Sequence, residues 1–162
     1  MNLIEQVKDA LVQPRPQERA SKLEQLSDNF EYAQDLKEEE IVESVTQLLV
    51  VALQEKDPEA KESFFHAMNA AVVHHQKEKI GERVDWDILV AALPGLEKPY
   101  LDYAFNMLSL SRRERYLSVL SSYTRSEDAE ISELARDAMD DLQYTLAHPS
   151  ASQGEEPSVP DQ

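Results

Sequence analysis

Apolar side chains recur every three or four residues along most of this chain, the spacing that gathers them on one face of an α-helix. Five such segments span about residues 2–12, 17–30, 38–56, 57–75 and 85–93, and three more begin near residues 99, 111 and 128. The segment 38–56 is apolar over most of its circumference, which is typical of a helix buried among its neighbours. The pattern therefore predicts eight helices, with the third in the core.

Several residues at the ends of these segments match the signals that start helices. Asp35 with Glu38, and Ser111 with Glu114, have the spacing of a capping box, in which the first side chain accepts from an early amide and the second reaches back. Asp57 precedes a proline, which suits the first helical position because it has no amide proton. We expect all three sites to open helices.

A short pattern occurs twice, at residues 57–68 and 128–139. Both copies read D-x-E-(A/I)-x-E, then four variable residues and A-M, and they start 71 positions apart. This separation is two periods of about 35 residues, and periods of that length indicate stacked structural repeats. The helices then pair into hairpins at residues 1–36, 37–83, 84–110 and 111–148. The predicted fold class is all-α, an α-α superhelix or solenoid of about four antiparallel helical hairpins.

Composition agrees with this fold class and divides the chain into two parts. The sequence has only 3 glycines beside many Ala, Leu and Glu residues, which favours helices over sheets with tight turns. From residue 149 the chain consists mainly of Pro, Ser, Gly and acidic residues, with too little apolar surface to fold. We expect one helical-repeat domain at residues 1–148 and a flexible acidic tail at residues 149–162.

The segments that follow Asp57 and Asp128 resemble the second helix of HEAT-type repeats. Such helices commonly begin with a capping Asp and carry a small or branched apolar residue three positions later. Residues 97–104 resemble a third, weaker copy. A basic residue often follows the apolar position in these repeats, and it is Lys61 in one copy but Ser132 in the other. The resemblance implies a degenerate HEAT-like solenoid, a fold that serves scaffolds, adaptors, inhibitors and occasionally enzymes.

The net charge of −16 bears on the class of partner. A negative field repels nucleic acid and anionic membranes, whose binding requires clustered Lys and Arg, and it attracts basic proteins. The longest apolar run, residues 48–53, is too short to span a bilayer, and the N-terminal segment has no cationic leader. We therefore expect a cytoplasmic protein that binds another, basic protein, and neither nucleic acid nor membrane.

Residues that carry chemistry are sparse. The chain has no cysteine, and signatures of nucleophile elbows, phosphate loops, dinucleotide sites and zinc helices are absent. His74, Glu78 and Glu82 have helical spacing and could share one face as metal ligands. We favour the alternative, in which His74 and His75 stabilise the C-terminal end of a helix. We accordingly assign no catalytic residue, no metal and no cofactor.

Six residues are candidates for contact with a partner: Asp85, Trp86, Asp87, Tyr103, Asp137 and Asp141. An exposed Trp86 could anchor an interface, although its register with the apolar positions of its helix favours a place in the core. Tyr103 lies off the apolar stripe of its helix, so we expect it at the surface of an aromatic and acidic concave face.

These observations favour a non-enzymatic protein-binding module. The chain is similar in size and acidity, without a shared motif, to small bacterial immunity proteins that bind and neutralise a cognate toxin. Within the binding class we therefore favour an immunity or inhibitor protein directed at a basic toxin or effector. Two alternatives stay open: a general HEAT-like adaptor or scaffold, and a HEAT-like enzyme such as a tetrapyrrole lyase, which would need a concave apolar pocket.

Overall fold

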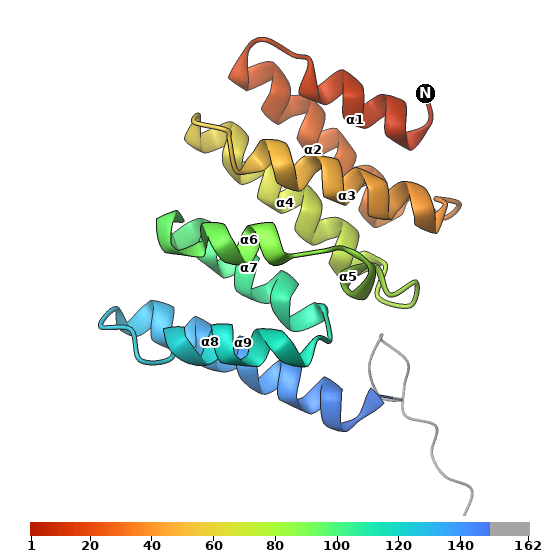
Figure 1. The fold of residues 1–162 in the computed structure, drawn as a ribbon. Helices are drawn as coiled ribbons and strands as arrows, with labels where there is room; N and C mark the ends of the chain where they lie inside the picture. The colour runs from red at the N-terminus through yellow and green to blue at the C-terminus, as the bar shows by residue number, and fades with distance from the viewer. Residues whose placement is uncertain (150–162) are drawn as a thin grey trace, which may run out of the picture.

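The computed structural model describes residues 1–149 (Figure 1), and every regular element in that range is a helix. The all-α prediction is therefore confirmed. The α-helices are α1 (Leu3–Leu11), α2 (Pro16–Tyr32), α3 (Glu38–Ala52), α4 (Pro58–His74), α5 (Ile80–Arg83), α6 (Asp87–Ala92), α7 (Lys98–Leu110), α8 (Leu117–Tyr123) and α9 (Ala129–Ala147). Two 3-10 turns, η1 (Leu93–Gly95) and η2 (Glu114–Tyr116), precede α7 and α8. Apart from Pro149, the predicted tail at residues 149–162 lies outside the described residues.

The helices are arranged as four stacked pairs, α1/α2, α3/α4, α6/α7 and α8/α9, in chain order from one end of the stack to the other (Figure 1). The second helix of each pair contacts the second helix of the next, so α2, α4, α7 and α9 form a continuous second-helix layer. Within residues 1–149, only α1 and α3 make an extensive contact between first helices. The second helices are therefore packed more closely along the stack than the first helices.

The duplicated segments open α4 and α9 in the same way. The Asp57 carboxylate accepts a hydrogen bond from the Ala60 amide at 3.0 Å, and the following proline takes a position in the first turn. The Asp128 carboxylate accepts from the amides of Glu130 and Ile131 at 3.0 and 3.3 Å. Both predicted caps are confirmed, and each satisfies amides that would otherwise have no intrahelical partner.

Both predicted capping boxes are wrong. Helix α3 begins after Lys37, with no side-chain cap, because Asp35 lies two residues too early to reach its first amides. Ser111 instead closes the end of α7, where its hydroxyl donates to the Leu108 carbonyl at 2.6 Å and accepts from the Arg113 amide at 3.2 Å. The chain then passes through η2 before α8 starts.

The segment between the predicted helices at residues 57–75 and 85–93 contains a further short helix, α5. Ile80 and Val84 are fully buried, and they anchor this short helix in the core. Gly81 lies so close to α7 that an added Cβ would stand 2.4 Å from the Leu110 carbonyl oxygen. The Trp86 indole Nε1 donates to the Gly81 carbonyl at 2.8 Å. The segment thus ties the second hairpin to the third.

The core follows the stack and is deepest at α3 and α4. Helix α3 buries Ile41, Val45, Leu48 and Leu49, as predicted for a core helix, but Val50 stays 46% exposed. Helix α4 contacts α2, α3, α5 and α7, and its buried side chains include Phe64, Phe65 and Met68. No helix within residues 1–149 combines the length and the apolar character needed to cross a membrane.

Candidate protein-binding groove

A groove with a volume of about 270 Å³ lies where α2, α4 and α7 meet in the second-helix layer. We call it the acidic groove, and its lining residues are Glu24, Glu59, Glu62, Ser63, His66 and Tyr103. Glu24 comes from α2, Tyr103 comes from α7, and the other four come from α4. The groove therefore depends on the stacking of three successive second helices.

Helical spacing explains why α4 supplies most of the lining. Glu59, Glu62, Ser63 and His66 are separated by three, one and three positions, so they share one face of the helix. Tyr103 approaches this face from α7, where its ring centroid lies 6.4 Å from that of buried Phe65. The ring is thereby held at the wall of the groove while part of it stays accessible. Tyr103 therefore lies only partly at the surface, because its side chain is half-buried and packs against the core.

An imidazole and a carboxylate face each other across the groove. His66 Nδ1 lies 2.9 Å from Glu24 Oε1, and the two side chains are 46% and 49% exposed. The His66 ring also lies against Tyr103, with 6.5 Å between the ring centroids. This contact links α2, α4 and α7 at the surface, but its exposure makes it a weak contributor to stability.

The acids of the groove act together on Tyr103. Partial burial raises the pKa of the Tyr103 phenol, and the negative charges of Glu62, Glu24 and Asp102 raise it further. Each of these carboxylates disfavours a second negative charge nearby. The same negative potential favours a positive group that enters the groove.

The lysines and arginines of the second-helix layer are all engaged elsewhere. Their contacts are Arg19 with Glu55 at 2.7 Å, Lys22 with Asp9 at 3.0 Å, Lys61 over the Tyr100 ring at 5.0 Å, Lys98 with Asp128 at 2.8 Å, and Arg136 with the Thr124 carbonyl at 3.4 Å. In the described part of the chain, the only contact between a groove acid and a side chain that can carry a positive charge is that of Glu24 with His66. Glu59 and Glu62 are therefore exposed carboxylates without an internal counter-charge.

Asp137 and Asp141 lie on α9, the next second helix after α7. Both are exposed, and desolvation raises the pKa of Asp141, with further contributions from the charges of Asp137 and Asp140. Asp137 takes the position in the second copy of the repeat that His66 takes in the first. The two aspartates belong to the same helix layer as the acidic groove but not to its lining.

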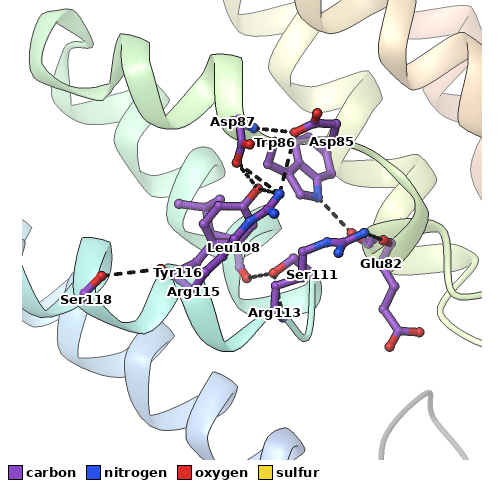
Figure 2. Close-up of polar contacts among 11 residues, drawn as sticks. Glu82, Asp85, Trp86, Asp87, Leu108, Ser111, Arg113, Arg115, Tyr116 and Ser118 are labelled. Carbon is purple, nitrogen blue, oxygen red and sulfur yellow. Dashed lines mark hydrogen bonds and ion pairs between the residues drawn. The ribbon is translucent and has the colours of Figure 1, made fainter.

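The cluster around Trp86 lies elsewhere, between α5, α6 and the start of α8 (Figure 2). Trp86 is fully buried, so its candidate role as a surface anchor is wrong and its predicted place in the core is confirmed. The Asp87 carboxylate accepts from the Tyr116 hydroxyl at 2.8 Å and pairs with Arg115 at 3.0 Å. Asp85 accepts from the Asp87 amide at 2.9 Å. These contacts fasten α6 to η2.

Three basic residues, Arg112, Arg113 and Arg115, also pair within the chain. Arg113 donates to the Glu82 carbonyl, and Arg112 lies 3.9 Å from the Glu82 carboxylate (Figure 2 shows the first contact). Arg112 and Arg113 thus connect the start of the fourth hairpin to α5, and Arg115 connects it to α6 of the third hairpin. This cluster stabilises the fold and leaves the acidic groove as the candidate site.

The described residues contain no group of side chains that could form the alternative metal site. Among residues 1–149, no three His, Asp or Glu side chains lie where they could hold a metal ion together. His74 is the last residue of α4, and His75 is its buried C-cap, with Nε2 2.8 Å from the Phe30 carbonyl oxygen. The predicted position of both histidines at a helix C-terminus is confirmed.

A second cleft, with a volume of about 520 Å³, lies beside the start of α4. Glu55, Lys56, Lys61 and Glu97 are among the residues that line it, so charges of both signs are present. Its polar groups therefore favour no single charge of ligand, in contrast to the acidic groove. The chain matches no protein-family model, no curated protein and no solved structure with which it was compared.

Proposed function

We propose that the chain is a degenerate HEAT-like solenoid that binds another protein through its second-helix layer, with a basic surface of that partner against the acidic groove. The observation that carries the proposal is the pair of exposed carboxylates, Glu59 and Glu62, which have no internal counter-charge beside the Tyr103 ring. Exposed acids next to an aromatic wall are complementary to the Lys and Arg side chains of a basic protein.

The net charge supports a partner that is attracted over distance. A charge of −16 steers a basic protein toward this chain and raises the rate of association. The volume of the acidic groove, about 270 Å³, is below the range of about 300–1,000 Å³ that is typical of small-molecule sites. The groove is thus suited to one side chain of a larger partner, and the surrounding helix surfaces would supply the remaining contact area.

Within this class we propose an immunity or inhibitor role. A toxin or effector that acts on nucleic acid needs a basic surface, and an acidic helical layer can cover that surface and block it. The −16 charge and the groove both support this role. Neutralisation of the partner's activity at a one-to-one ratio would distinguish an inhibitor from an adaptor, which would bind without blocking.

Capture from the native host tests the binding function. The tagged chain is purified at low salt beside two triple variants with equal changes of charge. The groove variant is Glu24→Gln/Glu59→Gln/Glu62→Gln. The control variant is Asp35→Asn/Glu114→Gln/Glu127→Gln, which alters exposed acids outside the groove.

The proposal predicts that a basic protein accompanies the unmodified chain and the control variant in stoichiometric amount, and is lost from the groove variant. Equal capture by all three chains would contradict the assigned surface. A bound small molecule in place of a protein would instead support the enzyme alternative.

A further inference from the structure

The acidic groove already holds a planar, nitrogen-bearing group, the imidazole of His66. The Nδ1 atom of this ring lies 2.9 Å from the Glu24 carboxylate, and the ring is tilted by 43° to that of Tyr103, with 6.5 Å between the two centroids. A carboxylate and an aromatic face are the two groups that together recognise a guanidinium. His66 thus marks the place where such a group fits.

We propose that one arginine side chain of a protein partner replaces the His66 imidazole beside Glu24 and lies against the Tyr103 ring. This inference rests on the proposed binding function and names the side chain that the groove receives. His66 then serves as an internal substitute, which occupies the site in the free protein and leaves it when the partner binds.

The surroundings of the imidazole favour its replacement. His66 and Glu24 are about half exposed, so the contact between them is screened by water and readily exchanged. Rotation about the side-chain bonds of His66 is sufficient to free Glu24, because the ring is not enclosed by the core. Exchange therefore requires no movement of α2, α4 or α7.

Arginine fits the groove better than lysine does. A guanidinium is planar and donates in a fork, so it can pair with Glu24 while its face lies on Tyr103, and Glu62 adds a second carboxylate to the lining. A lysine ammonium is a compact charge that cannot combine both contacts in the same way. The groove thus combines charge and shape that select a flat cation.

Titration with model compounds tests the inference without knowledge of the partner. The probes are N-acetyl-arginine amide, the lysine analogue and the uncharged citrulline analogue, each added to the full chain while NMR follows the side-chain resonances of His66 and Tyr103. We expect saturable shifts with the arginine compound, at least several-fold weaker binding of the lysine compound, and no saturation with citrulline. Equal binding of arginine and citrulline, or of arginine and lysine, would overturn the assignment.

Substitutions test whether the ligand displaces His66 or whether His66 stays in the groove and contacts the ligand. Glu24→Gln should weaken binding of the arginine compound several-fold, and Asp35→Asn, which also removes one exposed charge, should not. His66→Ala should strengthen binding, because it removes the internal competitor. Weaker binding by His66→Ala would show that the imidazole contacts the ligand, and the exchange would then be wrong. If the chain captures a basic protein but the arginine compound does not bind, the exchange fails while the proposed function stands.

Discussion

The packing of α5 against α7 can be tested by adding a single Cβ atom at Gly81. Gly81 sits in α5, and a Cβ added there would lie 2.4 Å from the carbonyl oxygen and 2.9 Å from the carbonyl carbon of Leu110. Both of these atoms belong to the backbone at the end of α7, so no side-chain rotation relieves the clash. Gly81→Ala must therefore push α5 and α7 apart.

The size of the effect follows from two opposing contributions. Inserting a methyl group into a packed site destabilises a protein by about 1–3 kcal/mol. Alanine in place of glycine within a helix stabilises the fold by about 0.5–1 kcal/mol, because the unfolded chain loses less conformational entropy on folding. We expect Gly81→Ala to lower the free energy of unfolding by about 1–2 kcal/mol, which corresponds to about 2–8 °C in Tm for a domain of this size.

Trp86 can report on unfolding at this junction, and Gly95 provides a control substitution. Trp86 is the only tryptophan, it is fully buried, and it donates to the Gly81 carbonyl, so its fluorescence follows urea unfolding at this junction. Gly95 has no atom within 4 Å of an added Cβ, and Gly95→Ala should be neutral or more stable by up to about 1 kcal/mol. A Gly81→Ala protein as stable as Gly95→Ala would refute the packing of α5 on α7.

Three further predictions concern the caps, the core and the response to acid. Asp57→Ala should lower the free energy of unfolding by about 1 kcal/mol because it removes a helix cap, whereas Asp35→Ala should leave it unchanged; urea melts of both variants check this, and equal losses would contradict the cap assignment. Tyr116→Phe should destabilise by about 1 kcal/mol because it deletes a hydrogen bond to a carboxylate of α6, and an unchanged melt would show that this bond contributes nothing. Partial burial alone would raise the pKa of Glu55. Hydrogen bonds from Arg19 and from backbone amides outweigh this effect, so the pKa of Glu55 lies below its ordinary value of 4.5. The lowered pKa stabilises the fold above about pH 4.5, and this stabilisation is lost as the pH falls through the lowered value. The stability gap between the natural chain and Glu55→Gln, about 2 kcal/mol at pH 7, should therefore shrink below pH 4.5, and a gap that is constant from pH 7 to pH 3 would contradict the ion pair.

Much of the scaffold could be predicted from local patterns. The spacing of apolar residues indicates most of the helices. Asp57 and Asp128 act as caps because each directly precedes its helix. The same logic failed for Asp35 and Ser111, because a chain with 32 acids places a glutamate three residues after a polar side chain by chance. Helix α5 escaped prediction because four residues are too few for a periodic signal, and the burial of Ile80 depends on distant helices.

The acidic groove was only partly predictable for a related reason. Tyr103 could be placed at the surface from its position off the apolar stripe of α7. Its neighbours Glu24, Glu62 and His66 come from two other helices, and no spacing within one helix indicates which faces of three helices will meet. The sequence does indicate that Glu62 and His66 share a face of α4. That face becomes part of a groove only because α2 and α7 pack beside it.

Recognition of a basic protein by the acidic groove can be tested through the rate of association with the captured partner. We would measure the association rate constant at low and at physiological salt for the natural chain, for Glu24→Gln/Glu59→Gln/Glu62→Gln and for Asp35→Asn/Glu114→Gln/Glu127→Gln. We expect the groove variant to associate about 10-fold more slowly at low salt, with a smaller dependence on salt, while the control variant stays close to the natural chain. Equal slowing by the two variants would show that net charge alone guides the encounter and would contradict the assignment of the groove.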